Sequence, residues 1–161
     1  MTPAGWERGD YLDRPLRDLL DDTGGHDALP AAGTVVATTA ALASALVVKI
    51  ARRSRSYRPD ADELVARAEK LLATVVPHIS GDAALYAAVL HERSAANLRA
   101  AMIPPRVVAE TSTAVAELAA DLADTGNPAL AHDAAAAHRL ATTAADVAAS
   151  LTAANDPRED S

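Results

Sequence analysis

Apolar residues recur at helical spacing over most of the chain. The first such segment, residues 11–22, carries four leucines on one side, between acids and arginines: Leu12, Leu16, Leu19 and Leu20. This is the pattern of an amphipathic helix. Two glycines and a proline in residues 23–30 predict the end of that helix. From Ala31 a second helix is apolar nearly all round, so we expect it to be the central, buried helix.

Three further helical segments follow. Residues 62–92 predict a long helix interrupted near Pro77 and Gly81, and residues 95–124 predict another with a kink at Pro104. Residues 129–154 predict a last, mostly alanine helix. The pattern therefore predicts an all-α, up-and-down bundle of about five helices, some long and kinked. We expect one domain over residues 11–154, a flexible N-terminus over 1–10 and a disordered tail over 155–161.

The composition limits how these helices can pack. Alanine fills 41 of the 161 positions, aromatic residues are 2% and phenylalanine is absent. Alanine has the highest helix propensity, which favours helix over strand. A buried alanine contributes little transfer free energy, so alanine helices depend on close neighbours. A short chain with a wholly apolar central helix commonly covers it with a second copy, so we expect a homodimer.

Charge and cysteine content exclude several classes of protein. The formal net charge is −7, which argues against a nucleic-acid-binding face. The absence of cysteine excludes disulfides and fits a reducing cytoplasm. We expect no apolar run to be long enough to span a bilayer, and the N-terminus lacks the apolar core of a secretory signal. We therefore expect a cytoplasmic protein with a small-molecule partner, without nucleic acid or membrane.

Motifs for metals and phosphates are missing. The five histidines show no Glu-x-x-His or His-x-x-x-His spacing, so no metal site is predicted. There is no phosphate-binding loop, dinucleotide fingerprint or serine nucleophile motif either. No covalently bound cofactor is expected.

Two candidate binding segments flank the second helix. At its start, Gly33 lets a ligand approach the backbone and Thr34 adds a hydroxyl, although Thr34 can equally be a helix cap. At its end, five cations occur in residues 49–58, among them Arg52 and Arg53, with Tyr57 beside them. They can hold a carboxylate-bearing tail, or simply complement the dipole at the helix C-terminus.

Two acids lie in apolar helical surroundings. Asp82 precedes Tyr86 by one turn, and Asp133 follows Asn127 within an alanine run. A carboxyl group in an apolar pocket has a raised pKa and can transfer protons near neutral pH. Alternatively, Asp82 caps a helix restarted after Gly81 and Asp133 lies on an exposed face. A pocket containing both acids and Gly33 would favour catalysis.

The order of these segments resembles the cyclodeaminase/cyclohydrolase family, which includes the cyclodeaminase domain of formiminotransferase-cyclodeaminase and methenyltetrahydrofolate cyclohydrolase. The most specific match is Gly-Asn-Pro-Ala-Leu-Ala-His-Asp over residues 126–133. Residues 30–34 stand where the family has a Pro-Gly-Gly-Gly-Ser loop, and residues 79–86 resemble its acid and aromatic on the long helix. Residues 103–110 resemble its proline-kinked helix. The resemblance covers about residues 12–150.

The resemblance implies a dimer of helical bundles acting on a one-carbon unit carried by tetrahydrofolate. The reaction is either hydrolytic opening of a methenyl ring or ring closure of a formimino group with loss of ammonia. Asp82 and Asp133 would be acid and base, the arginines around Arg52 would meet the glutamate tail, and Gly33, Thr34, Arg53, Tyr57, Tyr86 and Asn127 would bind the substrate.

The chain departs from the family at the loop, where Ala31 and Ala32 replace glycines and their Cβ atoms restrict the backbone. Three functions therefore remain open. The first is folate one-carbon chemistry. The second is the same scaffold used for cyclisation or ring opening of another small molecule. The third is a non-catalytic dimeric helical binding protein, so whether the chain is an enzyme stays undecided at this point.

Overall fold

The computed structural model describes residues 8–157, and these residues form helices without any strand. The elements are η1 (Tyr11–Asp13), α1 (Leu16–Thr23), α2 (Ala32–Arg53), α3 (Ala61–Val75), α4 (His78–His91), α5 (Ala95–Ala101), α6 (Ile103–Thr125), η2 (Pro128–Leu130) and α7 (Ala131–Ala154). The predicted tail beyond Pro157 and the first seven residues lie outside the described residues.

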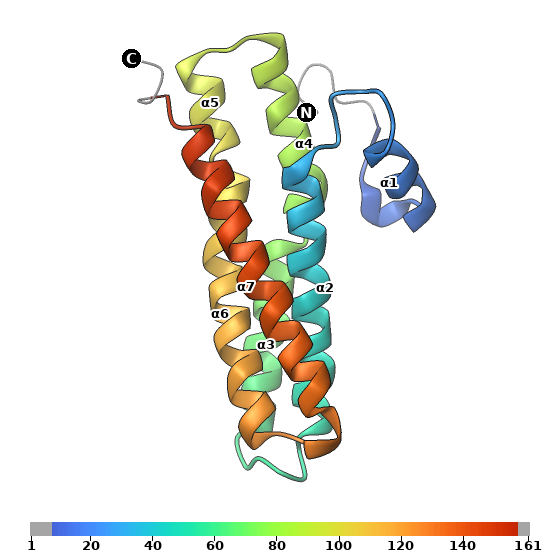
Figure 1. Cartoon of the computed structure of the whole chain (residues 1–161), viewed down its shortest axis with the longest axis vertical. Coiled ribbons are helices and arrows are strands. Elements are labelled where there is room, and N and C mark those ends of the chain that lie inside the picture. Colours follow the sequence, from blue (N-terminus) through green and yellow to red (C-terminus); the bar gives the residue numbers. More distant parts are fainter. Residues whose placement is uncertain (1–7, 158–161) are drawn as a thin grey trace.

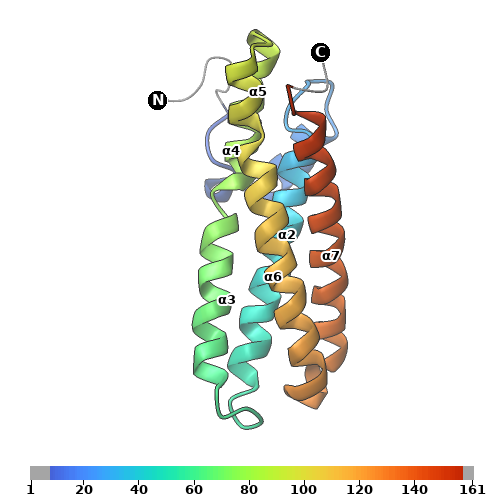
Figure 2. The same ribbon diagram turned by 90° about the vertical axis from the view of Figure 1, so that its left-hand side faces the viewer.

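The helices form an up-and-down bundle, as predicted (Figures 1 and 2). α2 runs down the bundle, α3 and α4 return, α5 and α6 run down again and α7 returns beside α6 and α2. Both predicted long helices are divided, the first at Val76 and Pro77 but not at Gly81, which lies inside α4, and the second at Met102, two residues before Pro104. Proline lacks the N–H that would continue the helical ladder, which explains the first break.

Alanine builds much of the interface between helices. Five alanines of α7 are buried at spacings of three or four residues: Ala134, Ala137, Ala141, Ala144 and Ala148. They face a core in which only a few larger side chains are almost fully buried, among them Ile50, Leu118 and Leu122. Small side chains allow the axes of neighbouring helices to come close together. The contacts of α7 therefore come from the close packing of many small side chains and not from a few large ones.

α2 is central but not buried all round. It packs against α3, α4, α6 and α7, yet Val35 and Leu42 remain 42% and 65% exposed. By length and composition, α2 and the combined α3–α4 segment are apolar enough to cross a membrane. The prediction that no segment is long enough was wrong on that criterion. Most of the apolar window in α2 is buried inside the bundle, as in a core helix.

α1 lies beside the upper half of α2, outside the bundle (Figure 1). It contains no buried residue, and Leu12, Leu16 and Leu20 are all more than half exposed. The amphipathic stripe was therefore correctly located, but only Leu19 packs against a core cluster. Pro15 precedes the helix rather than lying in its first turn.

Candidate functional site

The start of α2 meets α4 through Gly33 and Asp82. A Cβ atom added at Gly33 would overlap all three atoms of the Asp82 carboxyl group. The carboxyl group therefore occupies the volume that any other side chain at position 33 would need. Since α4 begins at His78, Asp82 lies inside a helix and does not cap one restarted after Gly81. The two segments, 49 residues apart in sequence, form one compact site.

Burial changes the protonation of Asp82. Desolvation raises the pKa of its carboxyl group from 3.8 to about 6, because the charged form loses water that no cation replaces. Within residues 8–157 the Asp82 carboxylate has no hydrogen bond or ion pair. An acid with a pKa near neutrality can both donate and accept a proton at physiological pH.

This pKa predicts a pH-dependent cost of Asp82 to stability. Below pH 4 the carboxyl group is protonated in both folded and unfolded chains, so burial costs little. As pH rises through 4 to 6, the unfolded chain loses its proton first, and stability falls by up to about 3 kcal/mol at 1.36 kcal/mol per pKa unit. Urea unfolding should show Asp82→Asn to be more stable than wild type at pH 7, with no gain below pH 4. The exposed Asp146→Asn is the control; an equal gain there would contradict the assignment.

The first turn of α2 offers polar atoms beside Asp82. Ala31, the N-cap residue, provides no side-chain hydrogen bond, so the first backbone N–H groups of α2 stay available. Thr34 is completely buried, and its Oγ1 has no hydrogen-bond partner among the described residues. Thr34 is therefore not a cap, and its unpaired hydroxyl is a group that a water or ligand can satisfy.

Tyr86 lies one turn above Asp82 on α4. It is partly buried against Val89, Leu98 and Ala101, where α4 and α5 form a short hairpin. Its ring also contacts the cluster that contains Ile79 and Ala83. Tyr86 therefore packs between two hydrophobic clusters, one of which also contains residues of α2.

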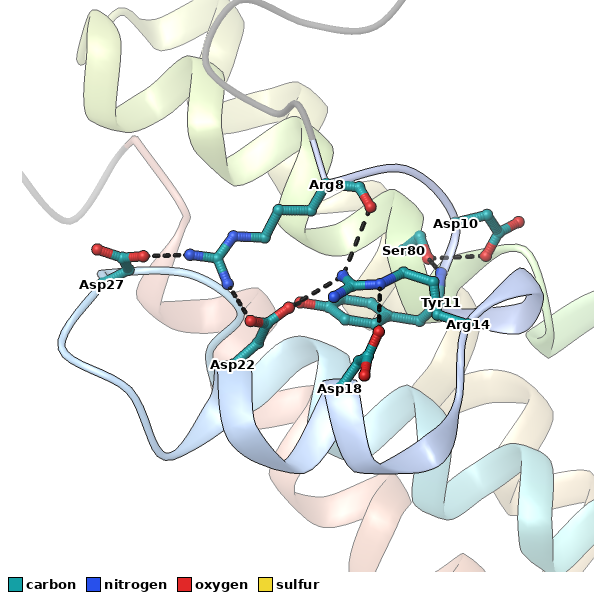
Figure 3. Close-up of polar contacts among 8 residues, drawn as sticks. All are labelled: Arg8, Asp10, Tyr11, Arg14, Asp18, Asp22, Asp27 and Ser80. Atoms are coloured by element: carbon teal, nitrogen blue, oxygen red, sulfur yellow. Dashed lines mark hydrogen bonds and ion pairs between the residues drawn. The ribbon is translucent and has the colours of Figure 1, made fainter.

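The N-terminal segment is fastened to α4 just before Asp82 (Figure 3). The backbone N–H of Tyr11 donates to Ser80 Oγ at 2.9 Å, and the Ser80 hydroxyl donates to Asp10 Oδ1 at 2.8 Å. Arg8 and Arg14 pair with Asp22 at 2.6 and 3.0 Å. Arg8 and Asp10 are thus fixed to the domain, although they belong to the stretch expected to be flexible.

Asp22 is the centre of this network. Burial acts to raise the pKa of its carboxyl group, but hydrogen bonds from Tyr11, Arg8 and Arg14 together lower it. The same cluster raises the pKa of the Tyr11 hydroxyl, chiefly by desolvation and then by its hydrogen bond to Asp22. The network holds Ser80, two residues before Asp82, in a fixed position.

The other predicted site residues lie at the far end of α2. Arg52 pairs with Glu69 at 2.6 Å, and Arg53 is exposed. Tyr57 is 52% exposed in the following loop. Asp133, in the first turn of α7, lies 3.9 Å from Lys49 and its side chain is 47% exposed. Sixteen residues separate Gly33 from Lys49, or about 24 Å of helix, so one chain does not bring Asp82 and Asp133 together.

Asn127 joins α6, α7 and the end of α2. Its side chain accepts from the backbone N–H of Ala129 at 3.0 Å and donates to the carbonyl of Arg53 at 3.2 Å. Its own backbone N–H donates to Ser54 Oγ at 3.0 Å. Ser54 is fully buried. These bonds are all structural, so the side chain of Asn127 is already engaged within the fold.

Two connected grooves run along α2. One, of about 320 Å³, lies between α1 and α2 and includes Tyr11, Leu16 and Leu42. The other, of about 430 Å³, lies between α2 and α3 and includes Arg52 and Glu69. Both contain Ala45, Leu72 and Val76. Neither groove contains Gly33, Asp82 or Asp133, so the predicted pocket holding all three is not formed by these grooves.

Comparison with known proteins decides the family. A family model described as formiminotransferase-cyclodeaminase matches residues 15–157, nearly the whole chain. The chain belongs to the formiminotransferase-cyclodeaminase family. A cyclodeaminase-type function linked to folate one-carbon units is thereby supported in general terms.

A solved structure of similar fold agrees with this family. The crystal structure of formiminotetrahydrofolate cyclodeaminase from Thermotoga maritima matches with a TM-score of 0.84 and 21% sequence identity. The match covers 91% of this chain and 80% of that one. At this identity the likeness shows the fold. A comparison with curated protein sequences gives no match.

In this member of the formiminotransferase-cyclodeaminase family, Gly126 is required by the joint at Asn127. A Cβ atom there would lie 2.5 Å from the carbonyl oxygen of Leu122 and 2.8 Å from Ser54 Oγ. Gly126→Ala should therefore lower the free energy of unfolding by about 1–3 kcal/mol. Chemical denaturation measures this; Gly81→Ala, where a Cβ meets nothing within 4 Å, should cost less than half as much. Equal losses would contradict a tight joint.

Sequence patterns missed Ser54 and Ser80. Each serine accepts a hydrogen bond from a segment more than 60 residues away, and a single serine on a helix carries no periodic signal. Only the packing of the bundle identifies them.

Proposed function

We propose that this chain transfers protons during cyclodeaminase or cyclohydrolase chemistry on a one-carbon unit carried by tetrahydrofolate. The observation that carries the proposal is the carboxyl group of Asp82, without an ionic partner and with a pKa of about 6, packed on Gly33. Family membership supplies the class of substrate. The adjacent α2 N-terminus and Tyr86 provide the polar and aromatic surroundings of a binding site.

The two reactions place similar demands on Asp82. In ring closure, a folate amine attacks the formimino carbon and loses its proton, and the departing nitrogen takes up a proton and leaves as ammonia. In ring opening, a water attacks the methenyl carbon and loses a proton as the ring C–N bond breaks. A carboxyl group half-ionised near pH 6 can take the first proton and return it to the leaving nitrogen.

The α2 N-terminus is the proposed place for polar atoms of the substrate. Its first N–H groups and the positive end of the helix dipole favour an oxygen or anionic group there. The unpaired Oγ1 of Thr34 adds a buried hydroxyl. Gly33 lets the ligand and Asp82 approach the same stretch of backbone.

Gly33→Ala should therefore reduce activity through Asp82. The new methyl group overlaps the carboxyl group, so Asp82 must rotate away from the site. We expect kcat/KM to fall at least tenfold and the acidic limb of the pH profile to move. The control is Gly81→Ala, adjacent to Asp82 but facing open space. Similar kinetics for the two variants would refute the role of Gly33.

A second candidate is a related reaction on another small molecule. Ala31 and Ala32 carry Cβ atoms in the loop that precedes Gly33, where the family resemblance predicts glycines. If folate has to lie against glycine backbone without Cβ atoms, a substrate that binds against the loop of this chain must be narrower than folate. In this case Asp82 keeps its role and the substrate changes.

Absorbance separates the candidates. Purified protein should make the near-ultraviolet absorbance of methenyltetrahydrofolate disappear faster than it does in buffer. With formiminotetrahydrofolate, the protein should instead raise the near-ultraviolet absorbance and release ammonia. An Asp82→Asn variant should do neither. No acceleration by the wild type with either compound would reject the folate function and leave the second candidate.

A further inference from the structure

Residues 8–14, which we call the N-terminal clamp, are hydrogen-bonded to the first turn of α4 (Figure 3). The Ser80 hydroxyl lies between two groups of the clamp. It accepts from the backbone N–H of Tyr11 at 2.9 Å and donates to Asp10 Oδ1 at 2.8 Å. Because the hydroxyl both accepts and donates, the turn of α4 that leads to Asp82 is fixed to the clamp.

The same clamp holds the chain that leads into α2. Arg8 forms ion pairs with Asp22, in the last turn of α1, at 2.6 Å, and with Asp27 in the loop after α1. Asp27 precedes Gly33 by six residues. The clamp therefore connects the segment that carries Gly33 to the segment that carries Asp82.

Tyr11 is the buried centre of the clamp. It is 6% exposed and belongs to the same core cluster as Val36 of α2 and Ala83 of α4. Its hydroxyl donates to Asp22 at 2.9 Å. The Arg14 guanidinium, which pairs with the same carboxylate, lies 5.0 Å from the centre of the Tyr11 ring, within the range of a cation–π contact. Tyr11 therefore couples the ion pairs to the packing of α2 on α4.

The Asp82 carboxyl group has no polar contact of its own to hold it. Within residues 8–157 it has neither hydrogen bond nor ion pair, and residues 32–48 of α2 contain no ionisable side chain. The other ionisable side chains on α4 and on the elements packed against it at this end of the bundle are His78, Tyr86, Asp10, Tyr11, Arg99, Arg106 and Glu110. The position of Asp82 thus depends on how α4 is held against α2.

We propose that the clamp keeps Asp82 packed on Gly33 and shielded from water, with Asp22 as the central positioning residue. When the clamp opens, the first turn of α4 can move away from α2, and water reaches the carboxyl group. The clamp precedes residue 15, where the match to the family model begins, so it lies outside the part of the chain that the model describes. The role of Asp82 in the reaction rests on the proposed function, whereas the control of its hydration does not.

Titration of the protein without substrate tests the clamp. Tyr11→Phe removes the hydrogen bond to Asp22, and Ser80→Ala removes the bonds to α4; neither changes the charge of the protein. Each should lower the pKa of Asp82 from about 6 toward 3.8, with a loss of proton affinity of about tenfold or more, because water favours the charged form. Carbon-13 NMR of aspartate-labelled protein measures the pKa, and Asp82→Asn assigns the signal. An unchanged Asp82 pKa in both variants overturns the proposal.

Asp121→Asn is the matched control for Asp22→Asn. Asp121 also binds an arginine and a hydroxyl, Arg58 at 2.9 Å and Thr125 at 3.1 Å, but it lies near the end of α6, at the opposite end of the bundle. Asp22→Asn should lower the pKa of Asp82 at least as much as the neutral variants. Asp121→Asn should leave that pKa unchanged, even where both substitutions lower the free energy of unfolding. Equal changes would assign the effect to general loosening of the fold and refute the clamp.

Kinetics test the consequence for the reaction. Ser80→Ala should lower kcat about tenfold with little change in KM, because the acid is no longer held in its productive position. The acidic step of the pH profile should move to lower pH, and Asp121→Asn should leave kcat unchanged. In an Asp82→Asn background, Ser80→Ala should have no further effect. Unchanged kcat in Ser80→Ala rejects the positioning role. A wild type inactive on folates rejects the proposed function alone, and the titration still decides the clamp.

Discussion

Replacing Asp82 by asparagine is expected to lower kcat for the folate reaction by roughly 10²- to 10⁴-fold, the usual contribution of a positioned acid or base. Asparagine keeps the size of the side chain on Gly33 but neither accepts nor releases the proton. KM should change little, since the polar atoms of α2 remain. Steady-state absorbance kinetics from pH 5 to 9 measure both parameters.

The pH profile identifies the group. With wild type, activity should change with an apparent pKa near 6, the value to which burial raises Asp82. The residual activity of the variant should lack that step. Because the same substitution is expected to stabilise the fold at neutral pH, lost activity cannot be ascribed to unfolding. A variant with wild-type kcat and the same pH step would remove Asp82 from the mechanism.

Ala137→Leu is expected to destabilise the bundle by about 2–3 kcal/mol, near the upper range for overpacking. Ala137 is completely buried in a cluster with Leu118 and Ala119 of α6. The close approach of α6 and α7 depends on the absence of larger groups there. Urea denaturation should show a lower midpoint with an unchanged slope.

An exposed alanine on the same helix provides the control. Ala149→Leu lies on the outside of α7 and should change stability by less than about 0.5 kcal/mol. If both leucines were equally tolerated, the α6–α7 interface would be loosely packed. If both were equally harmful, the effect would belong to leucine in the helix rather than to the interface.

Helical periodicity and proline breaks predicted the bundle well. The run from Ala31 and the alanine helix after Pro128 begin within two residues of the predicted positions, and the long middle helix is interrupted at Pro77 as predicted. They could be predicted because each depends on residues close in sequence. The leucines of α1 were different: their spacing indicates an apolar side but not what covers it, and within this chain Leu16 and Leu20 stay exposed.

The amino-acid sequence predicted the candidate site only in part. The contact of Gly33 with Asp82 depends on the register between α2 and α4, which no local pattern specifies. The separation of Asp133 from Asp82 follows from helix length: α7 begins where α2 ends, and α2 spans 22 residues, about 33 Å. Family resemblance brought these residues into one hypothesis, but only the fold shows that they occupy opposite ends.

The joint at Gly126 and Asn127 affects how relatives of this chain can be recognised. The segment that most resembles the family is occupied with holding three helices together. A search built on that segment will therefore find chains that keep this architecture, including any whose chemistry has been lost. Distinguishing the active members from the inactive ones requires a second criterion. That criterion is a glycine that contacts an aspartate on another helix, far away in the sequence.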